Sequence, residues 1–306
     1  MNNNYFRFGC TLLLVVGLTA CGGGGGGGVG ITYKPFTSWN SVLAGDTIVA
    51  IGDSQQGTYT WDSGTNKITA VSSASQQPGA TFTESFDSTG VARTVRFQTA
   101  SGTDITFTRG IDTFGYLNIN SNFWAIVSPN LSNQKYAIMA DPTQLGWNYQ
   151  SFGIWTTGAG SGSGTFGAAS VGQPTPAGSI PTSGSANYNG YAGGRYVASD
   201  GSYYYTLASM TTSADFATRQ LNFATTYTEQ TPDLVTSAIN SSLNMSGTLT
   251  YASGSNQFSG VVSTNNGMTG TATGRFYGPA YQEIGGTFTV TGSGIQGYGG
   301  AFGGAR

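Results

Sequence analysis

The feature that most constrains the fold of this chain is an alternation of apolar and polar residues that recurs from Asp46 onward. No stretch sustains the i, i+3, i+4, i+7 apolar spacing of a normal helix. Because successive side chains of a β-strand point to opposite faces of a sheet, a period of two predicts half-buried strands. Segments rich in Gly, Ser, Thr and Asn separate these strands, as at 62–66 and 101–103, and such segments are typical of hairpin turns. The sequence therefore predicts an all-β protein.

Candidate strands follow one another at roughly 8–12-residue spacing, which is typical of β-sandwiches and β-barrels. In the first half they lie at 47–51, 57–61, 67–71, 81–86, 92–97, 104–108, 116–120, 123–127 and 136–139. In the second half they lie at 149–155, 186–197, 203–208, 216–226, 243–251, 258–263, 268–277, 284–290 and 297–302. A single helical turn is the most that we expect within 232–239.

The number of later strands predicts a closed barrel, because roughly eight antiparallel strands close a small one. We expect an antiparallel eight-stranded β-barrel over residues 145–306 and a smaller all-β domain over residues 31–144. Glycines inside the later strands would provide the bends of a tightly curved sheet, at Gly190, Gly193, Gly260 and Gly270.

The first 30 residues have the features of a secretory signal followed by a tether. Residues 2–7 carry one positive charge, and the apolar run 12–18 is too short to span a bilayer. Small residues precede Cys21 and seven glycines follow it, an arrangement that resembles the lipobox of bacterial lipoproteins. By that resemblance residues 1–20 are a signal peptide, Cys21 carries lipid, and 21–30 form a flexible tether of roughly 15 Å. The alternative is an ordinary signal peptide whose cysteine occurs there by chance.

The composition excludes several kinds of chemistry. Since the chain has no histidine, a Ser-His-Asp triad and a histidine-ligated zinc or haem are impossible. Charged residues make up 8% of the chain, 11 basic and 13 acidic, so no basic stripe is present to neutralise nucleic-acid phosphates. Aromatic residues make up 13%, which indicates a folded chain. We predict no catalytic residue, no cofactor, no metal ligand and no nucleic-acid partner.

Four segments of the C-terminal half carry a resemblance to one protein family. They are 180–190, 214–221, 272–288 with its Gly-Arg-Phe-Tyr-Gly-Pro run, and the chain end 300–306. Together they resemble the β-barrel domain of transferrin-binding protein B and related bacterial surface lipoproteins, over roughly residues 145–306. The resemblance implies a handle domain before the barrel and a ligand such as transferrin, haemoglobin, haem or complement factor H. It transfers no ligand-contacting residue, and residues 31–144 match no handle motif.

Several aromatic residues have a packing interpretation and a binding interpretation. Phe276, Phe288 and Phe302 are predicted to fill the barrel. Tyr203 and Tyr205 share one face of a strand and Tyr204 takes the other; packing is favoured over an exposed aromatic contact. The cluster Phe123, Trp124, Trp147, Tyr149, Phe152 and Trp155 is expected to be core where the two halves meet.

Other motifs lack the context that their chemistry needs. Gly162–Gly167 and Gly292–Gly297 match the dinucleotide fingerprint, but no helical pattern follows either one. A glycosidase needs only two carboxylates, and Glu84, Glu229 and Glu283 are the only glutamates. Arg306 either pairs with Glu283 or is solvated.

These observations together predict a non-catalytic, ligand-binding lipoprotein of the outer membrane or cell surface. Its partners would be the membrane, through lipid on Cys21, and a host protein or small ligand, with iron-related ligands and an outer-membrane transporter among the candidates. A structural envelope lipoprotein without a dedicated ligand and a secreted carboxylate-dependent hydrolase are the alternatives. Because Gly22 after Cys21 is not the aspartate that resembles an inner-membrane retention signal, the outer membrane is the expected location.

Overall fold

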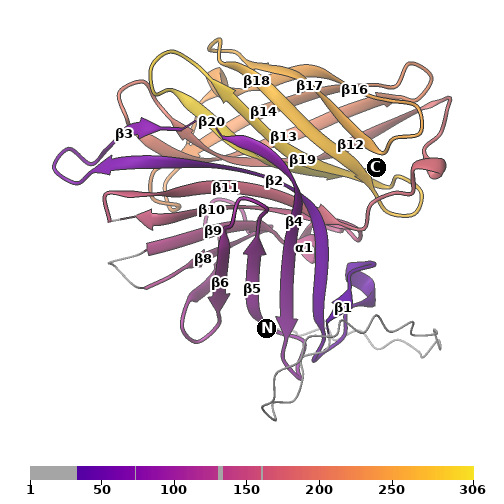
Figure 1. Ribbon diagram of the computed structural model, residues 1–306, viewed down its shortest axis with the longest axis horizontal. Coiled ribbons are helices and arrows are strands. Elements are labelled where there is room, and N and C mark those ends of the chain that lie inside the picture. The colour runs from indigo at the N-terminus through magenta and orange to yellow at the C-terminus, as the bar shows by residue number, and fades with distance from the viewer. Residues whose placement is uncertain (1–32, 73, 130–133, 160) are drawn as a thin grey trace. The chain divides into compact units, whose positions relative to one another are not determined.

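Two β-sheets, one open and one closed on itself, contain nearly all the regular structure in the described part of the chain (Figure 1). The computed structural model describes residues 33–72, 74–129, 134–159 and 161–306. These residues belong to one compact unit, Thr32–Arg306. The predicted signal peptide, the predicted lipidation site Cys21 and the glycine tether lie outside the described residues. No helix among the described residues is long and apolar enough to cross a membrane.

The open sheet has eleven strands and runs in the order β6-β5-β4-β2-β11-β10-β9-β8-β7, with β1 and β3 also paired to β2. Its strands are β1 (Lys34–Pro35), β2 (Thr47–Asp62), β3 (Lys67–Val71), β4 (Ser75–Phe86), β5 (Ala92–Gln98), β6 (Asp104–Thr108), β7 (Thr113–Tyr116), β8 (Phe123–Val127), β9 (Gln134–Ala140), β10 (Gln150–Ala159) and β11 (Ser163–Gly172). The helix α1 (Pro142–Leu145) links β9 to β10, and a 3-10 turn, η1 (Trp39–Ser41), precedes β2.

The second sheet closes into an antiparallel barrel of eight strands, because its first and last members, β13 and β14, also pair with each other. The barrel strands are β12 (Ser185–Val197), β13 (Tyr203–Asp215), β14 (Gln220–Thr231), β16 (Met245–Tyr251), β17 (Gln257–Thr264), β18 (Thr269–Tyr277), β19 (Glu283–Thr291) and β20 (Gly297–Ala305). The short β15 (Ala238–Ile239) pairs with β14 outside the ring, and η2 (Ala177–Ser179) and η3 (Ser241–Leu243) are 3-10 turns. The predicted all-β class and eight-stranded barrel are confirmed.

The interior of the barrel is filled by apolar side chains. Alternate residues of each strand point inward, as the period of two requires. Phe276, Phe288 and Phe302 are fully buried in this cluster, as predicted, and the ring centroids of Phe258 and Phe276 lie 5.4 Å apart. The barrel therefore has a packed core, like that of other small barrels.

The open sheet has its own core on one face. Ala80 and Phe82 of β4 pack there with Phe97 of β5 and Trp155 of β10. The Phe97 and Trp155 rings are stacked with centroids 5.4 Å apart. The barrel and the open sheet therefore each have an apolar core of their own.

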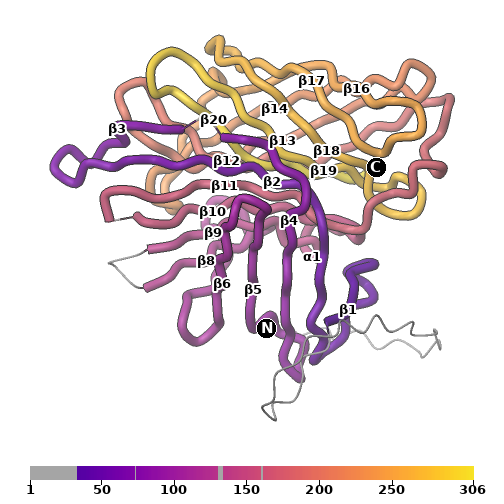
Figure 2. The backbone as a smooth tube through the Cα atoms, viewed as in Figure 1, coloured from indigo at the N-terminus to yellow at the C-terminus, as the bar shows by residue number. Residues whose placement is uncertain are grey.

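The two sheets also touch each other directly, over the strands that run side by side in the tube view (Figure 2). The Gln55 amide of β2 donates hydrogen bonds to the carbonyl oxygens of Phe288 and Gly300 at 2.5 and 2.9 Å. Glycine lets the two sheets come this close at a second place, between Gly303 of β20 and Gln150 of β10. A Cβ on Gly303 would lie 2.4 Å from the Gln150 side chain. Gly303 thus permits sheet-to-sheet contact, and the bends at Gly190, Gly193, Gly260 and Gly270 stay a prediction.

Three details differ from the sequence expectations. The strand expected at 149–155 among the barrel candidates is β10, and it pairs with β9 and β11 in the open sheet. The strand β11 was not expected, because glycine and serine are frequent at its start. No helical turn forms within 232–239, where bends lead into β15. The proposed domain division at 144/145 stays a prediction.

Candidate binding surfaces

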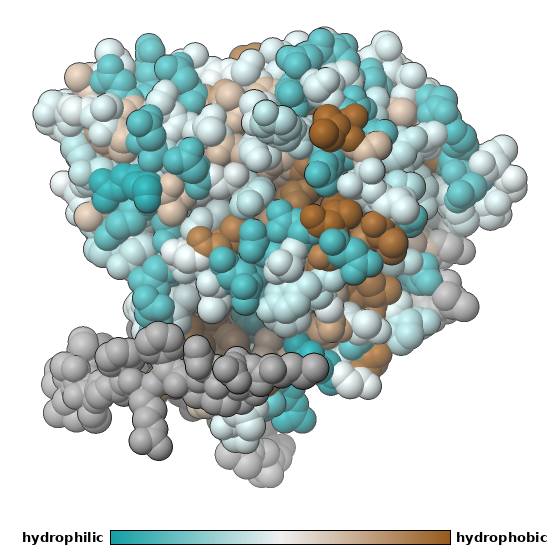
Figure 3. All heavy atoms as spheres, turned by 180° about the vertical axis from the view of Figure 1, so that it is seen from behind, coloured by the Kyte–Doolittle hydropathy of each residue, from teal (hydrophilic) through white to brown (hydrophobic). Residues whose placement is uncertain are grey.

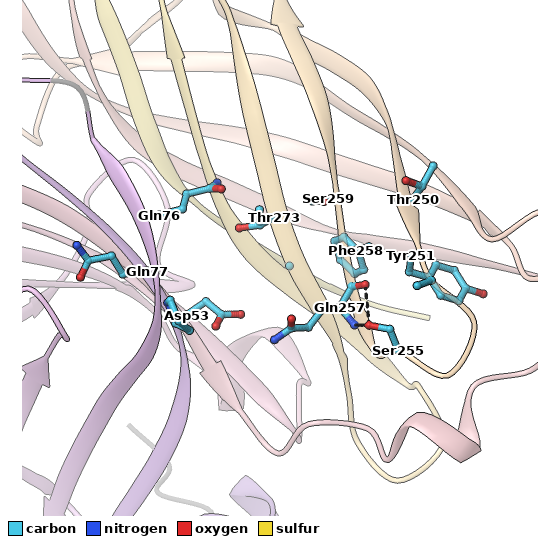
Figure 4. A pocket seen from close by; sticks show the side chains of 13 residues that line it. Asp53, Gln76, Gln77, Thr250, Tyr251, Ser255, Gln257, Phe258, Ser259 and Thr273 are labelled. Atoms are coloured by element: carbon cyan, nitrogen blue, oxygen red, sulfur yellow. Dashed lines mark hydrogen bonds between the residues drawn. The ribbon is translucent and has the colours of Figure 1, made fainter.

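An open cleft of about 730 Å³ lies between the start of β4 and the wall made by β16 to β18. Figure 4 shows Gln76 and Gln77 on one side of this inter-sheet cleft and Gln257 on the other. Its one lining carboxylate, Asp53, is held by Arg275, whose Nε and Nη2 atoms lie 2.9 and 2.6 Å from the Asp53 carboxylate oxygens. Because this ion pair compensates both charges, the cleft presents mainly neutral hydrogen-bonding groups.

A second hollow, of about 280 Å³, lies on the open sheet and contains two carboxylates. We call it the Glu84 pocket; Trp39 and Trp124 contribute its aromatic walls. Glu84 lies two residues after the buried Phe82, so it shares the core face of β4. Burial raises the pKa of Glu84 to about 8, the nearby charge of Asp141 adds to the increase, and Arg109 opposes it.

Asp141, the other carboxylate in the Glu84 pocket, is fully engaged in structural hydrogen bonds. Its Oδ1 atom caps α1 by accepting from the backbone N–H groups of Thr143 and Gln144 at 2.9 and 3.3 Å. Its Oδ2 atom accepts from the Tyr116 hydroxyl at 3.0 Å. A glycosidase would need this second carboxylate free to act as base or nucleophile. The pocket is therefore better suited to holding a polar ligand than to hydrolysing one.

The other two glutamates do not line this pocket. Glu229 is on β14 of the barrel and accepts a hydrogen bond from the Ser237 hydroxyl at 3.1 Å. Glu283 is 3% exposed and accepts from the backbone N–H groups of Asn148 and Tyr149 at 2.6 and 2.9 Å. Burial raises the pKa of Glu283, and these hydrogen bonds oppose the increase. Among the described residues, no group of three or more His, Cys, Asp or Glu side chains could hold a metal ion.

Arg306 does not pair with Glu283 and is exposed, which is the solvated arrangement of the two that the sequence left open. Its guanidinium lies 4.3 Å from the centre of the Tyr281 ring and donates a hydrogen bond to the Ala280 carbonyl oxygen at 3.1 Å. Glu283 does not pair with Arg306. Its hydrogen bonds with Asn148 and Tyr149 connect the barrel to the segment before β10. The family motif thus contains a residue that joins the two sheets.

The aromatic residues of the sequence analysis are mostly core, as predicted. Tyr204 packs against the barrel interior, whereas Tyr205, 8% exposed, packs on the opposite face with Phe123 and Phe152 of the open sheet. The Phe123 and Phe152 ring centroids lie 5.8 Å apart. This face of β13 is covered by the open sheet, which the sequence pattern of one strand cannot reveal.

The segment from Tyr227 to Ile239 carries the most exposed aromatic residue of the described chain. Tyr227 is 72% exposed, Val235 58% and Ile239 66%. Tyr227 has a φ of +52° and lies where the β13–β14 register shifts, so a bulge turns this side chain outward. On the face drawn in Figure 3 most side chains are pale or teal, and the apolar side chains gather in a few groups. The 227–239 segment is therefore the best candidate for a protein contact.

One family model matches the barrel. Residues 180–306 match the model of the C-lobe and N-lobe beta barrels of Tf-binding protein B. The barrel of this chain is therefore similar to the barrels of transferrin-binding protein B. All four segments that carried the resemblance lie within the matched residues, so that prediction is confirmed. No curated protein matches the chain.

The chain is also similar to solved structures of transferrin-binding proteins B and of a surface lipoprotein. A mutant transferrin-binding protein B from Haemophilus parasuis Hp5 is 11% identical, with a TM-score of 0.45, and the match covers 86% of this chain and 76% of that one. Intact Ap-TbpB with both lobes is 10% identical at a TM-score of 0.43, with 86% and 77% covered. A protein described as a surface lipoprotein is 12% identical at a TM-score of 0.43, with 82% and 98% covered.

Proposed function

We propose that this chain is a surface-exposed, outer-membrane lipoprotein that binds a host protein without catalysing a reaction. The observation that carries the proposal is the match of residues 180–306 to the transferrin-binding barrel family. The Cys21 motif supports the lipid anchor, and an adjacent outer-membrane transporter would be the natural recipient of a captured nutrient. Transferrin is the first candidate partner, because the family description names it.

The 227–239 segment is the proposed contact surface. Exposed tyrosine supplies a large contact area that combines an apolar ring with a polar hydroxyl, and such residues dominate the energy of many protein interfaces. The pairing of Glu229 with Ile239 and of Gln230 with Ala238 holds the segment against β14. A segment held in this way loses little conformational entropy when a partner binds.

The composition predicts how such binding responds to salt. Charged residues make up only 8% of the chain, so long-range attraction contributes little to association. Binding through the 227–239 segment should therefore change little between low and high ionic strength. A steep loss of binding with added salt would contradict this proposal.

The test is capture of host transferrin by cells that display the full chain. We expect saturable capture of transferrin and none of serum albumin. Tyr227→Ala should weaken capture about tenfold or more, as for a central interface residue. Val261→Ala is the matched control, since Val261 is 68% exposed on β17 of the barrel. Ser259→Arg, which fills the inter-sheet cleft, tests whether that hollow contributes.

Each alternative function predicts a different outcome. A structural envelope lipoprotein would show no saturable host partner. A hydrolase would cleave a glycan or ester and lose that activity in Glu84→Gln. Palmitate labelling should disappear in Cys21→Ser, and label retained in that variant would contradict the lipid anchor.

A further inference from the structure

One arginine of the barrel is buried without a counter-charge. Arg195 lies on β12 and is only 7% exposed. Its Nη1 atom donates to the Thr156 hydroxyl of β10 at 3.1 Å, and its Nε atom has no hydrogen-bond acceptor. None of the four ion pairs formed by the described residues includes Arg195, and the undescribed residues contain no Asp or Glu. A buried cation without a partner is strongly unfavourable.

Two tyrosines from different sheets hold the guanidinium between them. The carbon of the Arg195 guanidinium lies 4.6 Å from the centre of the Tyr59 ring and 4.8 Å from the centre of the Tyr203 ring. The faces of aromatic rings attract cations, so this arrangement compensates part of the desolvation of Arg195. It also fixes the orientation of the planar group.

Arg195 lines a hollow of about 260 Å³ where the two sheets meet, which we call the Arg195 pocket. Its aromatic lining consists of Tyr59, Trp61, Tyr136, Tyr203 and Tyr205. The Trp61 indole N–H, like the Arg195 Nε, is buried without an acceptor. Apolar walls with a few unpaired donors are characteristic of small-molecule sites.

The one acidic residue at the rim does not neutralise Arg195. Asp233 accepts hydrogen bonds from the backbone N–H groups of Val235 and Thr236, at 3.0 and 2.9 Å. These bonds, with those from neighbouring hydroxyl groups, hold its carboxylate within its own loop. The positive charge in the pocket is therefore available to a ligand.

We propose that the Arg195 pocket binds a small organic carboxylate with a flat apolar body. The carboxylate supplies the missing counter-charge and acceptor, since guanidinium and carboxylate groups match in geometry. The aromatic walls cover the apolar part, and benzoate is a probe small enough for the volume of about 260 Å³. Pro232, Asp233 and Leu234 of the 227–239 segment line this pocket, so the site adjoins the host-protein surface proposed above, but its test does not depend on that surface.

The experiment compares benzoate with benzamide, a neutral molecule of almost the same shape, on the purified full chain. Calorimetric titration should show benzoate binding at one site, with benzamide at least tenfold weaker, because only benzoate carries the charge. Arg195→Met should abolish the benzoate signal. Arg93→Met is the matched control, since it removes the same charge from an exposed position on β5.

A second variant keeps the test decisive if Arg195→Met does not fold. Trp61→Phe retains an aromatic ring and removes only the unpaired N–H donor, so benzoate should bind roughly tenfold more weakly. The proposal is overturned if benzoate and benzamide bind equally, if benzoate binds undiminished to Arg195→Met, or if neither binds to the wild-type chain. None of these outcomes depends on whether the protein captures host transferrin.

Discussion

Glu84 should make the stability of this protein fall as the pH rises, and Glu84→Gln should remove that part of the dependence. In the folded protein its pKa is about 8, compared with an ordinary value of 4.5. Below pH 4.5 both the folded and the unfolded chain hold the proton, so no penalty exists. Between pH 4.5 and 8 only the folded chain holds it, and the free energy of unfolding therefore falls as the pH rises. Above pH 8 both states are ionised and the full penalty remains.

The size of the effect follows from the width of that window. The window is about 3.5 pH units wide, and each unit lowers the free energy of unfolding by at most about 1.4 kcal/mol. The loss of stability therefore has an upper limit of about 5 kcal/mol. The Glu84 side chain keeps partial contact with solvent, which reduces the desolvation penalty, and about 2–3 kcal/mol is the expected loss. Glutamine keeps the size of the side chain and cannot ionise. It should therefore match the wild-type stability near pH 4.5 and exceed it near pH 8.5.

Urea unfolding followed by tryptophan fluorescence, at intervals from pH 4.5 to 8.5, measures this difference. Glu283 also has a raised pKa, so the wild-type curve contains both contributions, and the difference between wild type and Glu84→Gln isolates Glu84. Glu229→Gln, on β14 of the barrel, is the matched control and should keep the wild-type slope. The reasoning is refuted if Glu84→Gln keeps the full wild-type slope, or if Glu229→Gln flattens it equally.

Three further predictions concern the barrel and its junction with the open sheet. Phe276→Ala removes a fully buried ring and should lower the free energy of unfolding in urea by about 3–5 kcal/mol. Val261→Ala, the control, should lower it by under about 0.5 kcal/mol. Similar losses in the two variants would contradict the packed core. Gly194→Ala places a Cβ 2.6 Å from the Tyr298 ring and should lower stability by about 1–3 kcal/mol, whereas Gly178→Ala, with open space around it, should be tolerated. Asp53→Asn and Arg275→Met should show a coupling energy of about 1–3 kcal/mol in a double-mutant cycle of unfolding free energies. The reason is that the two side chains are only 15% and 12% exposed. If the two losses of stability simply add, the ion pair contributes nothing.

Individual strands could be predicted well because each depends on a local pattern. The expected strands at 67–71, 104–108 and 123–127 have the observed bounds. The expected strands at 47–51 and 57–61 are the two ends of one longer strand, β2. The intervening glycine, aspartate and serine obscured its middle, since these residues are poor strand formers on their own. Pairing with β4 and β11 on its two sides holds this part of β2 in the sheet.

The candidate sites were harder to predict than the strands. One signal for Glu84 was present, because Phe82, Glu84 and Phe86 alternate along one face of a strand, and a carboxylate in an apolar row is unusual. No comparable signal existed for Arg195. It shares its face of β12 with Gly193 and Val197, and in an isolated barrel that face would be exposed, where an arginine is ordinary.

The sequence by itself determined the all-β class and the eight-stranded barrel, because alternation and turn residues act over a few positions along the chain, and four segments carried the resemblance of the barrel to transferrin-binding protein B. Only the tertiary structure decided which outer faces of the barrel are covered, and so which polar groups are buried. Glu283 and Arg195 acquire their roles from residues of the open sheet that are far away in the chain. The period of a strand shows that it has two faces, but desolvation depends on what packs against each face. That information belongs to the contact between the two sheets.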